Sequence, residues 1–152
     1  MKGEFDEMVS KFPGWLEALK QSPALARDQF RKVPNQGVYV FFDEQDQPLY
    51  VGRSDHMRAR LQMHSRPGSG HESASFAFML AKENTINTET VRRSRKDLQM
   101  DKEFSKNYFA KKDEVSKMKV RVIEIIDPAE QALFEIYASL EMNTPYNVWE
   151  NH

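Results

Sequence analysis

Cysteine is absent from this chain of 152 residues, and long apolar runs are absent as well. Without cysteine, disulfides and thiolate-bound metal sites are excluded. No segment approaches the roughly 20 apolar residues that a membrane-spanning helix needs. Phe5, Glu7 and Lys11 interrupt any signal-peptide pattern at the N-terminus. We therefore expect a cytoplasmic, intracellular protein without membrane contact.

Charge of either sign is scarcely in excess, because the formal net charge is only −1. This balance argues against strong non-specific binding of nucleic acid. The distribution is uneven, however: residues 53–119 hold an excess of Lys and Arg, whereas both flanking parts of the chain are acidic. Such asymmetry permits a local polyanion site without requiring one. The basic cluster at 92–96 fits a solvated helix face equally well.

Motifs of several enzyme classes are also missing. The sequence has no Walker loop, no dinucleotide-binding glycine pattern, no zinc-ligand spacing and no nucleophile elbow. What it does have is 39% hydrophobic and 30% charged residues, which is typical of a globular protein of this length with a real core. We expect a single domain over residues 1–152.

A β-hairpin is predicted for the segment that begins at Gly37. Strands over 37–42 and 49–52 are rich in β-branched and aromatic residues, and a polar turn separates them. Side chains alternate between the two faces of a strand, so Tyr39 and Tyr50 fall on the same face in the simplest register. The opposite, core face then carries Val38, Val40, Leu49 and Val51.

A short helix over residues 56–65 should follow, with Asp55 as its N-cap. Its inward stripe at i, i+3, i+4 and i+7 consists of Met57, Arg60, Leu61 and His64. Two polar residues one turn apart beside the core suggest a site, although both could also extend from the edge of the packed face to solvent.

The remaining elements complete an α/β (α+β) domain, a three-stranded, mainly antiparallel sheet flanked by helices. Helices are expected over 4–20 with a break at Pro13-Gly14, from Ser22-Pro23 to Phe30, over 73–83 and over 88–117. A third strand over 117–126 precedes a last helix, about 128–141. That helix is expected to bury Ala129, Ala132, Leu133, Ile136 and Leu140.

Taken together, these residues resemble the GIY-YIG nuclease superfamily. Gly37-Val38-Tyr39 and Tyr50-Val51-Gly52 match the two motif triplets, with Val in place of Ile in each. Arg60 stands at the position of the family's Arg, and His64 at one that is His in a subset of members. The segment AEQALFEIYASLEMNTPYN is similar to the family's metal-binding helix and the turn that follows it. The resemblance covers residues 36–64 and 117–147. Residues 1–34 then form a helical extension and 65–116 a helical insertion.

The resemblance implies a divalent-metal-dependent endonuclease that cuts DNA. Glu135 would hold Mg²⁺ or Mn²⁺, and Arg60 would contact the scissile phosphate. Tyrosine has a usual pKa of about 10 and is a poor base, so Tyr39 would need nearby positive charge to act as the base, with Tyr50 assisting and His64 relaying a proton or contacting phosphate. The expected substrate-binding residues are Gly52, Arg53, Arg58, His71 and Asn147.

Three functional alternatives stay open at this point. Singly, each of these residues is better explained by structure, because strand tyrosines usually pack and a helix Glu usually faces solvent. The chain could be a nuclease, a silent module that binds nucleic acid or a protein, or a nuclease that acts only with a protein partner. The sequence leaves open the oligomeric state, the DNA structure recognised and the choice between DNA and RNA.

Overall fold

The computed structural model describes residues 3–64, 76–77, 80 and 102–147. The chain forms two compact units, one comprising Met1–Ala59 with Met118–His152 and the other Arg60–Lys117. The division into one domain with a helical extension and a helical insertion stays a prediction.

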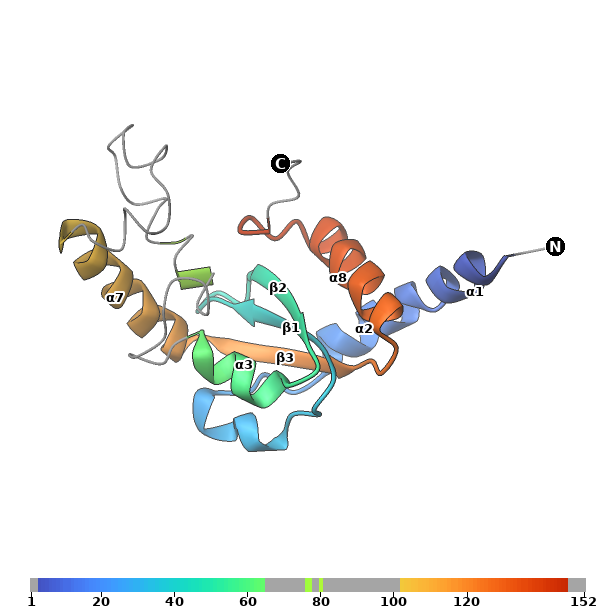
Figure 1. Cartoon of the computed structure of the whole chain (residues 1–152), viewed down its shortest axis with the longest axis horizontal. Helices are drawn as coiled ribbons and strands as arrows, with labels where there is room; N and C mark the ends of the chain where they lie inside the picture. Colours follow the sequence, from blue (N-terminus) through green and yellow to red (C-terminus); the bar gives the residue numbers. More distant parts are fainter. Residues whose placement is uncertain (1–2, 65–75, 78–79, 81–101, 148–152) are drawn as a thin grey trace. The chain divides into compact units, whose positions relative to one another are not determined.

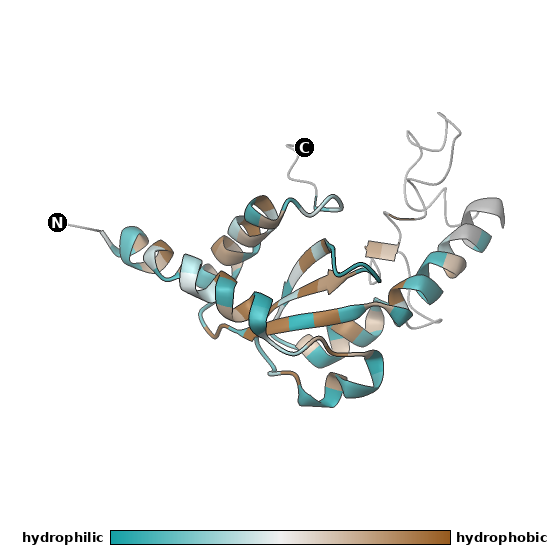
Figure 2. Cartoon of the chain, turned by 180° about the vertical axis from the view of Figure 1, so that it is seen from behind, coloured by the Kyte–Doolittle hydropathy of each residue, from teal (hydrophilic) through white to brown (hydrophobic). Residues whose placement is uncertain are grey.

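The first unit is built on a three-stranded antiparallel sheet. Its strands are β1 (Gly37–Phe42), β2 (Pro48–Ser54) and β3 (Lys119–Glu124), in the order β2-β1-β3 (Figure 1). All six residues of the central strand are buried, which explains why GVYVFF is apolar throughout. Edge strand β3 instead alternates hydrophobic and hydrophilic residues over part of its length (Figure 2). The predicted fold class is confirmed.

The hairpin turn is held by the side chain of Asp43. Its Oδ1 accepts hydrogen bonds from the backbone N–H groups of Gln45 and Gln47, both at 2.9 Å. The strand pairing shifts just before the turn, since Phe41 pairs with Tyr50 but Phe42 pairs with Pro48. Leu49 lies at this irregularity and is half-buried. Contrary to the prediction, it is not among the residues that form or flank the buried core cluster.

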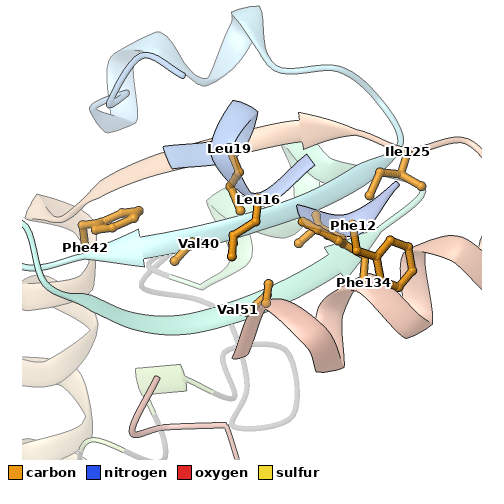
Figure 3. Close-up of a cluster of buried hydrophobic side chains, with 10 residues drawn as sticks. Phe12, Leu16, Leu19, Val40, Phe42, Val51, Ile125 and Phe134 are labelled. Atoms are coloured by element: carbon orange, nitrogen blue, oxygen red, sulfur yellow. The ribbon is translucent and has the colours of Figure 1, made fainter. Parts of the chain in front are cut away.

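The predicted alternation of the two strands is otherwise correct. One face of the sheet carries a buried cluster to which α2 (Phe12–Gln21) and α8 (Pro128–Met142) contribute (Figure 3). The members of the cluster are Phe12, Leu16, Leu19, Val38, Val40, Phe42, Val51, Ile125, Phe134 and Ala138. The other face carries Tyr39, Phe41 and Tyr50. Both tyrosines thus lie on the face opposite the main core.

The N-terminal helices differ in detail from the prediction. Helix α1 (Glu4–Ser10) and α2 are separated at Lys11, not at Pro13-Gly14. Pro13 stands in the first turn of α2, where the missing N–H removes no helical hydrogen bond. Because that position tolerates proline, the helix continues through Gly14.

No helix begins at Ser22-Pro23, contrary to the prediction. Ser22 ends α2, and its Oγ donates to the carbonyl oxygen of Leu19 at 2.7 Å. Leu25 then pairs with Val120 of β3 through two backbone hydrogen bonds of 2.8 Å. A 3₁₀ helix, η1 (Arg27–Lys32), follows. The pairing partner lies far along the chain, so a local start signal could not reveal it.

The last helix, α8, has nearly the predicted bounds. Asp127 caps it by accepting from the N–H groups of Ala129 and Glu130. It ends at Asn143, which adopts the left-handed conformation with φ of 53°. Asn tolerates this region better than most residues. The sequence thus predicts both ends of this helix well.

The predicted buried face of α8 is wrong in part: Leu133 packs against the core, but Ala129, Ile136 and Leu140 are exposed. The helix buries Gln131, Phe134, Ala138 and Ser139, while Ile136 and Leu140 are 39% and 62% exposed. Phe134 packs edge-to-face against Phe12, with ring centroids 5.4 Å apart, and this aromatic contact orients the helix. The Gln131 amide is buried because it donates to the Ile125 carbonyl and to Asp55.

The second unit is described in part. Helix α3 (Met57–Met63) begins in the first unit and continues into the second. Helix α7 (Lys102–Lys117) is the last element of the second unit along the chain. Of the predicted helix over 73–83, residues 76–77 and 80 are helical and buried. The cluster at 92–96 lies outside the described residues. Among the helices that are described, none is long and apolar enough to cross a membrane.

Candidate active site

The β1–β2 hairpin places the two motif tyrosines. Tyr39 lies directly across from Gly52, and Tyr50 lies across from Phe41. Cross-strand partners in an antiparallel pair share a face, so both tyrosines lie on the same side of the hairpin, as predicted. Tyr39 is 1% exposed and Tyr50 is half-buried. The hairpin therefore presents Tyr50 more openly than Tyr39.

Both glycines of the motif triplets are required by close packing. A Cβ at position 52 would overlap the phenol oxygen and ring of Tyr39. A Cβ at position 37 would overlap the carbonyl oxygen of Ile123 in β3. Gly52 thus gives the Tyr39 ring room to lie across β2. The sequence predicted instead that this glycine admits substrate, and that role stays a prediction.

Glu135 projects from α8 toward the end of β2. Its Oε1 lies 3.6 Å from Nε of Arg53, the residue that follows Gly52. The Glu135 side chain is 18% exposed and that of Arg53 is 46% exposed. Burial raises the pKa of Glu135 above its usual value, and the positive charge of Arg53 opposes this rise. The predicted metal ligand and a predicted substrate-binding residue therefore form an ion pair.

Asn147 fastens the chain after α8 to β2. Its Oδ1 accepts from the Val51 N–H and its Nδ2 donates to the Val51 carbonyl, both at 2.8 Å. Thr144 orients the amide, because its hydroxyl donates to the same Oδ1 at 2.7 Å. The Tyr146 N–H adds a bond to the Leu49 carbonyl. Since Val51 stands between Tyr50 and Gly52, this contact holds the second motif from outside the sheet.

Arg58 is exposed near the start of α3, and its Nη2 donates to the main-chain oxygen of Arg31 at 2.7 Å. The Met57 N–H likewise donates to the Asn35 carbonyl. These bonds tie the beginning of α3 to the segment around η1. Asp55, predicted as the cap of this helix, accepts from Gln131 of α8, and the Ser54 hydroxyl oxygen accepts from the His56 N–H.

Arg60 and His64 belong to the second unit. They lie one helical turn apart, and the His64 N–H donates to the Arg60 carbonyl at 3.2 Å. Arg60 is half-buried and His64 is fully buried. Burial, aided by the positive charge of Arg60, lowers the pKa of His64 to about 3. His64 is therefore neutral at physiological pH, which suits hydrogen bonding better than a cationic contact with phosphate.

Apart from Arg58, which binds the segment around η1, the predicted site residues that the structure describes fall into three groups. The first group, Tyr39, Tyr50 and Gly52, lies in the hairpin. The second group joins β2 to the C-terminal segment through two contacts, Arg53 with Glu135 and Val51 with Asn147. Arg60 and His64 share one turn in the other unit. His71 lies outside the described residues. Sequence reasoning missed Thr144 and the Arg53–Glu135 pair, although Thr144 stands in the turn that contains Asn147.

A divalent metal fits Glu135 by the chemistry of its donor. Within the described parts of the chain, no three His, Cys, Asp or Glu side chains gather around a common point. A single, partly exposed carboxylate nevertheless suits Mg²⁺, which keeps several waters and takes further oxygen ligands from substrate phosphates. Glu135 could hold such an ion beside β2, the second strand of the hairpin.

Comparison with known families agrees with these motifs. The model of the UvrC-like GIY-YIG domain matches residues 35–111, just over half of the chain. The match contains the hairpin and α3, and it also covers most of 65–116, which the motifs place outside the resemblance. It ends before Glu135 and Asn147. No curated protein and no solved structure matches the chain. On the family match and the antiparallel hairpin that displays both triplets, the chain belongs to the UvrC-like GIY-YIG domain family of the GIY-YIG nuclease superfamily.

Proposed function

We propose that the protein is a divalent-metal-dependent endonuclease that hydrolyses phosphodiester bonds in DNA. The observation that carries the proposal is the packing around β2: Tyr39 lies over Gly52, Glu135 pairs with Arg53, and Asn147 binds Val51. Three consecutive residues of one strand thus bring together side chains of β1, α8 and the segment after α8. A packed hairpin alone would not need a partly buried acid beside it.

The chemistry needs an activated water, neutralised phosphate charge and help for the leaving oxygen. Glu135 would hold Mg²⁺ or Mn²⁺, which supplies Lewis-acid stabilisation of the phosphate when bound. In the phenolate form, which the positive charges of the metal and Arg60 would favour, Tyr39 would accept the proton of the attacking water, and Tyr50 would orient that water. Arg60 donates charge-assisted hydrogen bonds to non-bridging oxygens. His64, neutral and buried, orients its neighbours through hydrogen bonds.

The substrate-binding residues extend this set. Arg53, Arg58 and His71 contact the phosphate backbone, which is where most protein–DNA hydrogen bonds form. Gly52, which is in β2, and Asn147, which binds Val51 of β2, hold this strand in the position that the substrate would contact. We further propose that the protein acts on DNA in the cytoplasm and does not bind a membrane.

The test is Mg²⁺-dependent nicking of supercoiled plasmid DNA by the purified protein. Glu135→Gln and Arg60→Gln should each lower the rate by about a hundredfold or more, as the loss of a transition-state contact does. Glu141→Gln is the matched control, because Glu141 is an exposed acid of the same helix. Full activity in Glu135→Gln or Arg60→Gln would show that the assignment is wrong.

A second candidate is a module on the same fold that binds nucleic acid or a protein partner without cutting; the net charge of −1, which is low for a nuclease without a separate DNA-binding domain, argues mildly for it. Such a protein would bind DNA in a salt-dependent manner. It would not nick the DNA, whichever divalent ion is added. A nuclease that requires a protein partner would instead regain Glu135-dependent cleavage in the partner's presence. The same plasmid assay, repeated in a cell extract and with each variant, separates these cases.

A further inference from the structure

The proposed reaction gives Arg53 and Glu135 separate roles, with phosphate and with the metal, and does not explain why the two groups pair with each other. The paired atoms are 3.6 Å apart, which is beyond hydrogen-bond distance. A guanidinium that permanently served to neutralise a carboxylate would be expected to bind it in bidentate fashion at a shorter distance. The contact is therefore loose, and separating the two groups costs little.

The surroundings of the pair give each partner a different role. Glu135 is 18% exposed, so its ionised carboxylate benefits from a nearby positive charge. Arg53 is 46% exposed and lies in edge strand β2, so its guanidinium can move into solvent. A divalent ion on Glu135 would repel a guanidinium that stayed this close. In the present arrangement the guanidinium therefore competes with such an ion for the Glu135 carboxylate.

We propose that Arg53 is an internal counter-ion that occupies the Glu135 carboxylate until a divalent cation displaces it. The inference rests on the proposed function, because it takes Glu135 as the metal ligand. Released from Glu135, the guanidinium stays tethered next to Gly52 and is available to a substrate phosphate, to which Arg binds well. Arg53 thereby couples the two binding events: metal frees the phosphate contact, and phosphate that captures Arg53 strengthens metal binding to the same extent.

The coupling is measured with Mn²⁺ as the probe, from the loss of the electron paramagnetic resonance signal of the free ion. The full-length protein is compared with Arg53→Gln and Glu135→Gln, in the absence of DNA. Arg53→Gln removes the competing cation, so it should bind Mn²⁺ about two- to fivefold more tightly than the unaltered protein. Glu135→Gln should lose this binding.

A second ion pair on the same helix provides a matched control. Lys11 lies 3.1 Å from Glu130 of α8, with side chains 52% and 16% exposed. Lys11→Gln makes the same change in charge and frees an acid of similar exposure. It should leave Mn²⁺ binding unchanged, whereas an equal gain in Lys11→Gln would mean that net charge alone controls binding and would overturn the inference.

Release of the guanidinium has its own signal. The ¹⁵Nε resonance of Arg53 should shift on addition of Mg²⁺ in the unaltered protein and should stay fixed in Glu135→Gln. If Mn²⁺ binds through Glu135 but Arg53→Gln binds no more tightly, the inference fails and the proposed metal site stands. If Glu135→Gln binds Mn²⁺ as the unaltered protein does, the proposed site itself fails, and the inference with it.

Discussion

Single side chains decide how closely the hairpin packs around Tyr39. The ring of this tyrosine takes the space that a side chain at position 52 would need. A glycine is thus selected here by a neighbouring side chain and not by an unusual backbone angle. Protonation of a single side chain, His64, also affects stability.

Gly52→Ala should lower the free energy of unfolding by about 1–3 kcal/mol, since the added methyl forces the Tyr39 ring away. Urea denaturation followed by circular dichroism measures the effect. Gly14→Ala is the control: nothing lies within 4 Å of a Cβ there, and Gly14 is in a helix. It should be neutral or stabilise by up to about 1 kcal/mol. Equal behaviour of the two variants would contradict the packing described for Tyr39.

His64 should make the protein sensitive to acid. Its folded pKa of about 3 lies below the usual histidine value of 6.5, so the unfolded chain binds more protons between these values. The stability that His64 contributes is therefore complete above pH 6.5 and is lost as the pH falls toward 3. His64→Gln should reduce the loss of unfolding free energy between pH 7 and pH 4.5 by on the order of 2 kcal/mol.

Urea unfolding at the two pH values provides the measurement for His64. His56→Gln is the matched variant, because His56 is exposed immediately before α3. It should follow the unaltered protein at both pH values. An acid sensitivity that His64→Gln leaves intact would mean that other groups, and not the buried imidazole, take up the protons.

At the scale of elements, the contacts of α8 and the segment after it with the sheet determine what the site can be. The helix presents Phe134 to the core and carries Glu135 beside it at the edge of the interface. Had α8 buried Ile136 and Leu140, as hydrophobicity alone predicts, Glu135 would have had a different setting. Its approach to Arg53 thus depends on the rotation that Phe134 imposes.

The orientation of α8 can be tested by paired substitutions. Phe134→Ala should cost about 3–5 kcal/mol of unfolding free energy, as expected for a buried aromatic residue. Leu140→Ala, at a position that is 62% exposed, should change it by no more than about 0.5 kcal/mol. Urea denaturation of both variants is the measurement. A large cost for Leu140→Ala would restore the face that the sequence predicts.

The contact of Asn147 with β2 should matter for both stability and activity. Asn147→Ala removes two hydrogen bonds to Val51, which is fully buried, and should destabilise by about 1–3 kcal/mol. Nicking activity should fall because Tyr50 and Gly52 lose their anchor. Thr144→Ser keeps the hydroxyl that orients the amide and should stay close to the unaltered protein. Unchanged stability in Asn147→Ala would remove the anchoring role.

For the molecule as a whole, the features set by local sequence patterns were predicted, and those set by long-range contacts were not. Period-two alternation gave the faces of Tyr39 and Tyr50, and the Asp127-Pro128 pair gave the start of α8. The pairing of Leu25 with Val120 and the rotation of α8 depend on partners distant in the sequence, so no local pattern encodes them.

The candidate site divides in the same way. Its residue types and their order resembled a known superfamily, and the family match over 35–111 bears out that resemblance for the hairpin and α3 but does not reach Glu135 and Asn147. The ion pair of Arg53 with Glu135 could not be predicted, because it joins two segments that come together only when α8 packs on the sheet. Spacing within a motif says nothing about such a contact.

The central position of β1 predicts how the first unit opens. Because β1 pairs with both neighbours and all its residues are buried, its amides should exchange with solvent only through global unfolding. The amides of α1, which has no buried residue, should exchange through local opening at a much lower free energy. Hydrogen exchange read by mass spectrometry would resolve the two, and equal protection would contradict this order.

The amide of Asn147 also stands where a fourth strand would otherwise begin. It gives Val51 one acceptor and one donor, as the backbone of a neighbouring strand would, and β2 lies at the edge of the sheet. Exposed edges are the places where sheets of separate molecules join into aggregates. The side chain that holds the second motif therefore also shields this edge. Truncation before Thr144 should therefore increase self-association through β2, measured by light scattering against the full-length protein.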